Sequence, residues 1–114
     1  FPVIPERFKQ KAGTLSGGEQ RMLLVSRALI AQPRIMLIDE ISEGLQPTMV
    51  ERVANVLKEA RRDLGVAILL VEQNLDFALS VADRYAVLKL GEIVDRGNVS
   101  DDNAATQIRS YLQV

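Results

Sequence analysis

Two neighbouring carboxylates, Asp39 and Glu40, directly follow the apolar run Ile35 to Ile38. A short continuous apolar run is typical of a strand covered on both faces in a parallel sheet, and open parallel sheets bind ligands at the carboxyl ends of their strands. Paired acids at that edge suit a hard cation such as Mg²⁺ and a general base that acts on water. The alternative is that both acids are solvated side chains of a loop.

An amide side chain, Gln73, follows a second apolar run from Val66 to Val71. If the two strands are neighbours, Gln73 lies near Asp39 and Glu40, where an amide could orient a water molecule or a phosphate oxygen. The alternative is a plain polar residue at the end of a strand.

Two glycines, Gly17 and Gly18, precede a long apolar segment with a helical pattern. Each glycine costs up to about 1 kcal/mol relative to alanine inside a helix. A helix N-terminus presents unpaired N–H groups, and glycine lets an anion approach them, so phosphate is a natural ligand. Ser16 and Glu19 also fit an S-x-x-E capping box, so the alternative is a capped helix whose glycines pack tightly.

The elements that position these groups are predicted from periodicity and from Pro and Gly. Residues 16–31 have apolar side chains around most of the circumference, which predicts a largely buried helix. A second helix is predicted from Pro47 to a C-terminal cap at Gly65. Its amphipathic stripe consists of Val50, Val53, Ala54, Leu57 and Leu64.

The alternation of strands and helices indicates parallel pairing, with a short helix after Asn74 that carries residues 75–82. Residues 85–90 and 92–95 flank Gly91 and predict a hairpin, followed by a polar helix over about residues 101–112. Residues 1–13 are predicted to be a loop without an independent fold.

Composition excludes several kinds of site. The chain has 114 residues, a net charge of −1 and scattered basic residues, which argues against binding to nucleic acid or to an anionic membrane. It has no Cys and no His, so catalysis must rest on carboxylates and amides. No apolar run approaches the roughly 20 residues that span a bilayer. We therefore expect a cytoplasmic chain, and the start at Phe1 suggests a fragment of a longer protein.

The order of "LSGGEQ", a helix, "IMLIDE", "SEGLQP" and "LLVEQN" resembles the nucleotide-binding subunit of ATP-binding cassette (ABC) transporters over residues 14–97. The resemblance implies an α/β fold, the C-terminal portion of a P-loop NTPase domain, with parallel strands, flanking helices, a hairpin and a last helix. The implied segments of this single partial domain are the signature helix 14–31, the Walker B and D-loop segment 35–47, the switch region 66–74, and the hairpin and helix 85–114.

The resemblance also implies roles for single residues. Asp39 would hold Mg²⁺ through water, Glu40 would be the catalytic base, and Gln73 would lie at the switch position. In the signature sequence, Ser16, Gly17 and Gly18 would contact the γ-phosphate of an ATP molecule that the opposite subunit holds. The whole set of signature residues expected to bind that ATP is Leu15, Ser16, Gly17, Gly18, Glu19 and Gln20. The D-loop residues, which would contact that subunit, are Gly44, Leu45 and Gln46.

Three departures from the family pattern matter. The family usually has Asp in place of Gln46 and His in place of Gln73; a Gln cannot take up a proton, but it can donate a hydrogen bond to the γ-phosphate. The form "VEQN" resembles the ATPases of branched-chain amino-acid and related amide or urea importers. The chain also lacks the phosphate loop G-x-x-x-x-G-K-[ST], so it resembles the C-terminal half of a cassette.

These features predict a fragment of an ATP-hydrolysing subunit that uses ATP and Mg²⁺ to power a membrane importer. Its partners would be a second nucleotide-binding subunit and transmembrane permease subunits, which would keep it at the inner face of the membrane. Alone, the chain is expected neither to bind ATP tightly nor to hydrolyse it. It is expected to self-associate through apolar surface around residues 35–38. The alternatives are an ABC ATPase without a transport role and a catalytically silent interaction module.

Overall fold

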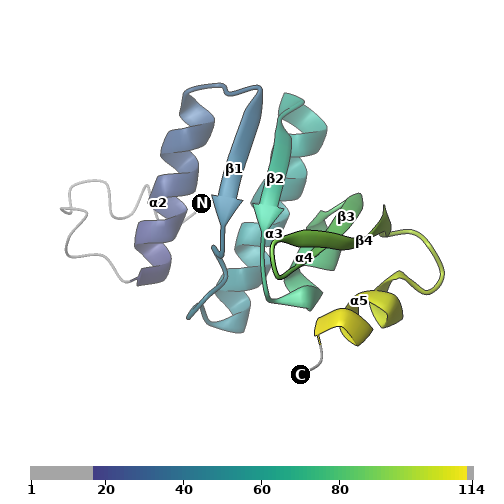
Figure 1. The fold of residues 1–114 in the computed structure, drawn as a ribbon. Helices are drawn as coiled ribbons and strands as arrows, with labels where there is room; N and C mark the ends of the chain where they lie inside the picture. Colours follow the sequence, from purple (N-terminus) through teal and green to yellow (C-terminus); the bar gives the residue numbers. More distant parts are fainter. Residues whose placement is uncertain (1–16, 113–114) are drawn as a thin grey trace.

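The computed structural model describes residues 17–112, so Leu15, Ser16 and the predicted loop over residues 1–13 lie outside the described residues. Within residues 17–112, eight elements follow one another, and Figure 1 shows their arrangement. They are α2 (Gly17–Ile30), β1 (Ile35–Asp39), α3 (Pro47–Leu64), β2 (Ala67–Val71), α4 (Leu75–Val81), β3 (Arg84–Lys89), β4 (Glu92–Asn98) and α5 (Ala104–Leu112).

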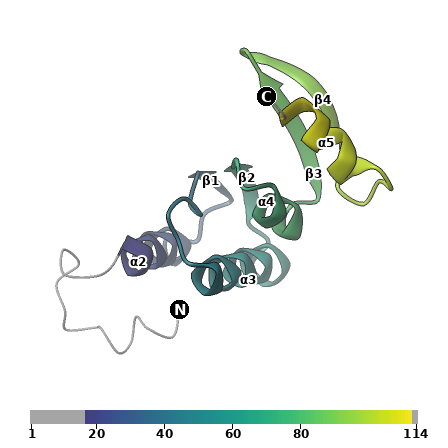
Figure 2. The same ribbon diagram turned by 90° about the horizontal axis from the view of Figure 1, so that it is seen from below.

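Strands β1 and β2 form a parallel pair, as predicted. In their register Ile35 is opposite Ala67 and Asp39 is opposite Val71, so both strands end at the same edge of the sheet. Helices α2 and α3 lie on the same side of this sheet, as Figure 2 shows. Because Asp39 and Val71 are paired at the ends of the two parallel strands, the segments that follow them leave the sheet at the same edge.

The prediction that both strands are covered on both faces is wrong for the described residues. Met36 and Ile38 are buried beneath β1, whereas Leu37 between them is 73% exposed, and Leu69 of β2 is 58% exposed. The physical reason is that α2 and α3 pack against one face only, so every second side chain has no cover. The expected apolar surface around residues 35–38 is thereby confirmed.

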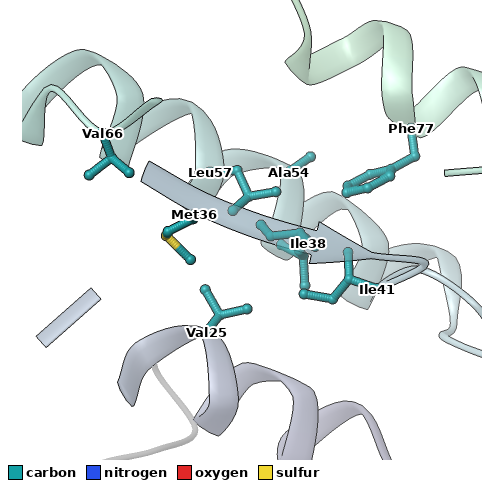
Figure 3. Packing of buried hydrophobic residues seen from close by; sticks show 9 residues of the cluster. Val25, Met36, Ile38, Ile41, Ala54, Leu57, Val66 and Phe77 are labelled. Carbon is teal, nitrogen blue, oxygen red and sulfur yellow. The ribbon is translucent and has the colours of Figure 1, made fainter. Parts of the chain in front are cut away.

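The core lies between the β1–β2 sheet and the helices. Side chains from α2, β1, α3 and α4 converge there (Figure 3). The cluster consists of Val25, Met36, Ile38, Ile41, Val53, Ala54, Leu57, Val66 and Phe77. Full burial of one such aliphatic or aromatic side chain contributes about 1.5–3 kcal/mol, so this cluster is the main source of stability for the sheet edge above it.

Helix α3 follows the prediction closely. Pro47 is its first residue, and Gly65 caps its C-terminus with a φ of 66° while its N–H donates to the carbonyl oxygen of Ala60. Of the predicted stripe, Val53 and Leu57 are almost completely buried, whereas Leu64 in the last turn is exposed. The left-handed conformation of Gly65 explains the sharp end of the helix, because residues with a Cβ rarely adopt it.

Helix α2 is less buried than predicted. Only Met22 and Val25 are buried, and Leu24 and Ile30 are exposed. The helix contacts the rest of the described chain through one face, so its apolar circumference exceeds what β1 and α3 can cover. It ends at Ile30, one residue before the predicted end.

The C-terminal part is an antiparallel hairpin, as predicted, with an irregularity between Val87 and Leu88. Strand β4 continues to Asn98, beyond the predicted end at residue 95. Helix α5 begins at Ala104 rather than near residue 101, because the preceding residues form a turn in which the Ala104 N–H donates to the Asp101 carbonyl at 3.1 Å. The hairpin and α5 lie beyond α4, away from α2 (Figure 2).

Candidate functional site

The acids of the first motif lie where β1 ends. Asp39 is the last residue of the strand and is exposed, and the following residue, Glu40, is half-buried. Glu40 has a φ of 50°, a left-handed conformation that non-glycine residues seldom adopt. Its backbone N–H donates to the Val71 carbonyl at 2.8 Å, so the chain turns sharply across the end of β2. Such local strain persists only where surrounding contacts enforce it.

The expected D-loop residues lie in the connection from Glu40 to α3. Gly44 is exposed with a φ of 73°, which requires the conformational freedom of glycine. Leu45 is half-buried, and its N–H donates to the Ser42 carbonyl at 3.1 Å. Gln46 is exposed at the N-cap of α3, and its side chain makes no capping hydrogen bond. The amide of Gln46 is therefore presented at the surface.

The start of α2 packs beside this connection. A Cβ on Gly18 would lie 3.3 Å from Cγ of Met49 and 3.4 Å from Cδ2 of Leu45, whereas a Cβ on Gly17 would meet nothing within 4 Å among residues 17–112. Packing against the described residues therefore accounts for Gly18 and does not account for Gly17. An exposed glycine at a helix start also suits an approaching anion.

A side chain that was not expected ties α2 to the same connection. The Arg21 guanidinium donates to the carbonyl oxygen of Ile41 at 3.1 Å and also to that of Glu43. No motif in the sequence pointed to Arg21, because the bond depends on how the helix lies against the loop. Of the remaining expected signature residues, Glu19 is half-buried and Gln20 is exposed.

The second strand end carries Gln73 between two anchored neighbours. Gln73 itself is exposed. The Glu72 carboxylate accepts a hydrogen bond from the Ser42 hydroxyl at 2.6 Å, with the Ser42 N–H at 3.4 Å from the other oxygen. The Asn74 side chain accepts from the Phe77 N–H at 3.1 Å and caps α4. Asp39, Glu40 and Gln73 are thus brought to one edge, as the pairing of the strands predicts.

The electrostatics of this edge set Glu40 apart. Desolvation raises the pKa of its carboxyl above the usual value, and the negative charges of Glu43 and Asp39 raise it further. A side-chain hydrogen bond with Glu43 and the charge of Glu72 act in the same direction. A carboxylate with a raised pKa is a stronger proton acceptor, which suits a general base.

A ready-made metal site is not found among the described residues. Within residues 17–112, no three acidic side chains converge on one point. Mg²⁺ commonly keeps several waters and is held by one or two carboxylates together with phosphate oxygens. Asp39 is exposed at the end of β1. In the same range, no helix has the length and apolar character to cross a membrane.

Comparison with known proteins shows which family the chain resembles in sequence and fold. A family model described as "AAA domain, putative AbiEii toxin, Type IV TA system" matches residues 4–71. The branched-chain amino acid transport ATP-binding protein BraG of Pseudomonas aeruginosa is 48% identical over 82% of this chain and 40% of its own length. LivF of Archaeoglobus fulgidus, a probable protein of the same kind, is 37% identical over 89% of this chain and 43% of its own.

Matches also include the phosphonates import ATP-binding protein PhnC of Hydrogenovibrio crunogenus, 37% identical over 90% of this chain and 38% of its own. A crystal structure of a nucleotide-free ATP-binding cassette superposes with a TM-score of 0.78 and 28% identity, covering 89% of this chain and 39% of the cassette. The chain thus spans about two-fifths of the length of these relatives. The chain belongs to the family of ABC transporter ATP-binding subunits.

Proposed function

We propose that this chain is the part of an importer ATPase that supplies the catalytic acids, the switch glutamine and the signature helix for ATP hydrolysis. The observation that carries the proposal is the shared strand edge, where the Glu40 N–H bonds the Val71 carbonyl two residues before Gln73. The ATPases of this family use ATP with Mg²⁺. Asp39 would hold the ion through water, and Glu40 would act on the attacking water.

The proposed reaction is the transfer of the γ-phosphoryl group of ATP to water. The water oxygen bonds to the γ-phosphorus, the bond from that phosphorus to the bridging oxygen breaks, and ADP and inorganic phosphate result. Glu40 would take the proton of the water, for which its raised pKa is favourable. Gln73 would donate a hydrogen bond to the γ-phosphate, because a side-chain amide is a hydrogen-bond donor and does not act as an acid or a base near neutral pH.

The proposed partners follow from what the chain does not contain. Without a phosphate loop it would need the rest of a cassette to grip ATP, and titration of the chain alone with labelled ATP should show no micromolar affinity. The signature residues Leu15 to Gln20 would contact ATP held by a second nucleotide-binding subunit. Support comes from a solved match described as a dimeric bacterial ABC transporter cassette. Gly44, Leu45 and Gln46 would contact that subunit.

We further propose a transmembrane permease as partner, which would place the chain at the inner face of the membrane, and branched-chain amino acids as the solute. The names of BraG and LivF and the "VEQN" segment support this solute. Matches named for methionine and phosphonate import represent the competing solutes. Transport by a permease of known solute, energised by an ATPase containing this chain, would decide among them.

The activity is tested in a chimera in which this chain replaces the matched segment of BraG, here called the BraG chimera. Glu40→Gln should abolish steady-state release of phosphate, because it removes the base and leaves the side chain nearly isosteric. The control is Glu51→Gln, on the exposed surface of α3, which should leave turnover unchanged. Equal turnover of the parent and Glu40→Gln would remove Glu40 from the mechanism.

A further inference from the structure

We propose that Ser42 and Glu72 are positioning residues that fix the loop carrying Glu40 relative to the segment carrying Gln73. This inference rests on the proposed function, which gives Glu40 and Gln73 their roles. Neither Ser42 nor Glu72 would touch the nucleotide. They would act by setting the relative placement of the two residues that do.

The first argument is the burial of Ser42. Ser42 is 7% exposed, and it is the one polar residue among the buried side chains of residues 17–112. A buried hydroxyl requires a hydrogen-bond partner, and Ser42 finds it in Glu72, thirty positions further along the chain. The Oγ to Oε1 distance of 2.6 Å is that of a short hydrogen bond to an ionised acceptor. The bond therefore joins the segments after the two strands through a short, partly buried contact.

The second argument is the conformation of Glu40. Its positive φ has to be enforced by contacts on both sides of the residue. On one side, β1 is held in the sheet, and the Glu40 N–H is bonded to Val71. Two residues later, Ser42 is held by Glu72. Without the second contact, the loop would lose its link to the segment after β2. Arg21 would still bond to two loop carbonyls, but the Glu40 carboxylate would be less firmly placed relative to Gln73.

The third argument is the position of Gln73 between two anchored residues. Glu72 is held by Ser42, and one of its oxygens also lies 3.4 Å from the Asn74 N–H. The Asn74 side chain in turn caps α4 through the Phe77 N–H. Displacement of Glu72 would therefore displace Gln73 as well as the loop of Glu40. The pair is thus placed to keep the proposed base and switch residue in register.

The two acceptor oxygens of Glu72 explain why a glutamine would not replace it. A carboxylate offers two acceptor oxygens, and here one faces the Ser42 hydroxyl while the other faces the Ser42 N–H. In Glu72→Gln, only one oxygen remains, so the NH₂ group would face a backbone donor at either place. That donor is the Ser42 N–H at one oxygen position and the Asn74 N–H, 3.4 Å from Oε1, at the other. The amide variant should therefore weaken the contact although its size is nearly the same.

Steady-state turnover in the BraG chimera tests the proposal. Ser42→Ala should lower kcat about ten- to a hundredfold, the range expected for a misplaced catalytic group, with KM for ATP changed less than about twofold. Ser42→Thr, which keeps the hydroxyl, should restore most of kcat. Ser80→Ala is the matched control, since its hydroxyl donates at 2.7 Å to the Phe77 carbonyl within α4, and it should leave kcat unchanged.

A double-mutant cycle separates coupling from general damage. Ser42→Ala combined with Glu72→Ala should reduce kcat no further than the more severe single variant. Additive losses would overturn the proposal. So would an unchanged kcat for Ser42→Ala in a chimera that Glu40→Gln inactivates, and that result would leave the proposed function intact.

A second measurement does not depend on ATP hydrolysis. Amide hydrogen exchange in the 114-residue chain, followed by NMR, should become faster in Ser42→Ala at both Glu40 and Asn74. The Ala82 amide, bonded to Ala78 at the far end of α4, is the internal control. Unchanged exchange at Asn74 would show that the two segments are not coupled, and would overturn the proposal even if the chimera has no turnover.

Discussion

At the residue scale, the two glycines of the signature segment have different physical roles. Gly18 lies against Met49 and Leu45, so its lack of a Cβ is a packing requirement. A Cβ on Gly17 would meet none of residues 17–112 within 4 Å, so packing against these residues gives no reason for a glycine there. The phosphate hypothesis therefore rests more on Gly17 than on Gly18, a distinction that the sequence alone does not make.

This distinction predicts opposite effects of alanine at the two positions. Gly17→Ala should leave the chain as stable or raise its free energy of unfolding by less than about 1 kcal/mol, through better helix propensity. Gly18→Ala should lower it, because Met49 has to move. In the BraG chimera, Gly17→Ala should nevertheless reduce ATP turnover by tenfold or more. Urea unfolding and phosphate release measure the two quantities, and wild-type turnover of Gly17→Ala would refute an anion site there.

Glu40 predicts a pH dependence of stability whose sign is fixed by its pKa. Because the pKa is raised in the folded chain, the folded state binds the proton more tightly than the unfolded state does. The contribution of protonated Glu40 to the free energy of unfolding is fully present below the unfolded pKa of about 4.3. This contribution is lost as the pH rises through the folded pKa, because the ionised carboxylate is less favourable in the folded chain. Glu40→Gln should therefore raise the Tm at pH 7, and the difference should vanish below about pH 4.

Thermal unfolding across this pH range is the measurement, with Glu51→Gln as the control that should show no such difference. Added salt should reduce the effect at pH 7, because part of it is repulsion from Glu43 and Asp39. A lower Tm of Glu40→Gln at pH 7 would contradict the strained, repulsive environment assigned to this residue.

At the element scale, the sequence predicts helix ends and strand pairing, which depend on residues within or next to each element. It does not predict burial, which depends on the elements that pack against each other in space. Pro47 and Gly65 delimit α3 correctly because each acts through its own backbone. Parallel pairing follows from the strand and helix order, and it places Gln73 beside Glu40. Burial of alternate strand residues such as Leu37 depends on what covers the second face, which no local pattern records.

The contact of α2 with the loop after β1 belongs to the same class of unpredicted features. Arg21→Ala should lower the free energy of unfolding by about 1 kcal/mol, because it removes hydrogen bonds from one guanidinium to two loop carbonyls. Arg21→Lys should recover only part, since an ammonium lacks the planar fork. Arg27→Ala, exposed on the same helix, serves as control in urea unfolding. Equal stability of both alanine variants would show that this contact contributes nothing.

At the scale of the whole molecule, one face of the β1–β2 sheet exposes several large apolar side chains to solvent among residues 17–112. Leu37 and Leu69 stand exposed beside Ile35 and Val71, which are also more than half exposed. Contiguous apolar surface of this kind promotes association or marks an interface. The relatives, of which this chain spans about two-fifths, are longer proteins.

The chain alone should therefore associate in a concentration-dependent manner. Sedimentation velocity at tens of micromolar should show species larger than the 12.6 kDa monomer. Leu37→Glu should shift the distribution toward monomer. Leu24→Glu is the control, since Leu24 is also a largely exposed leucine but lies on α2, and it should shift the distribution much less. A parent chain that stays monomeric at all concentrations would contradict association through the sheet face.

The central claim is that Glu40 acts on water at a site that two subunits complete. Its most direct test is sedimentation of the BraG chimera with Glu40→Gln in the presence of ATP and Mg²⁺. The account predicts a stable dimer that retains unhydrolysed ATP, while the parent chimera hydrolyses its ATP and returns to monomer. A Glu40→Gln chimera that remains monomeric with ATP, or that releases phosphate as fast as the parent, would contradict it.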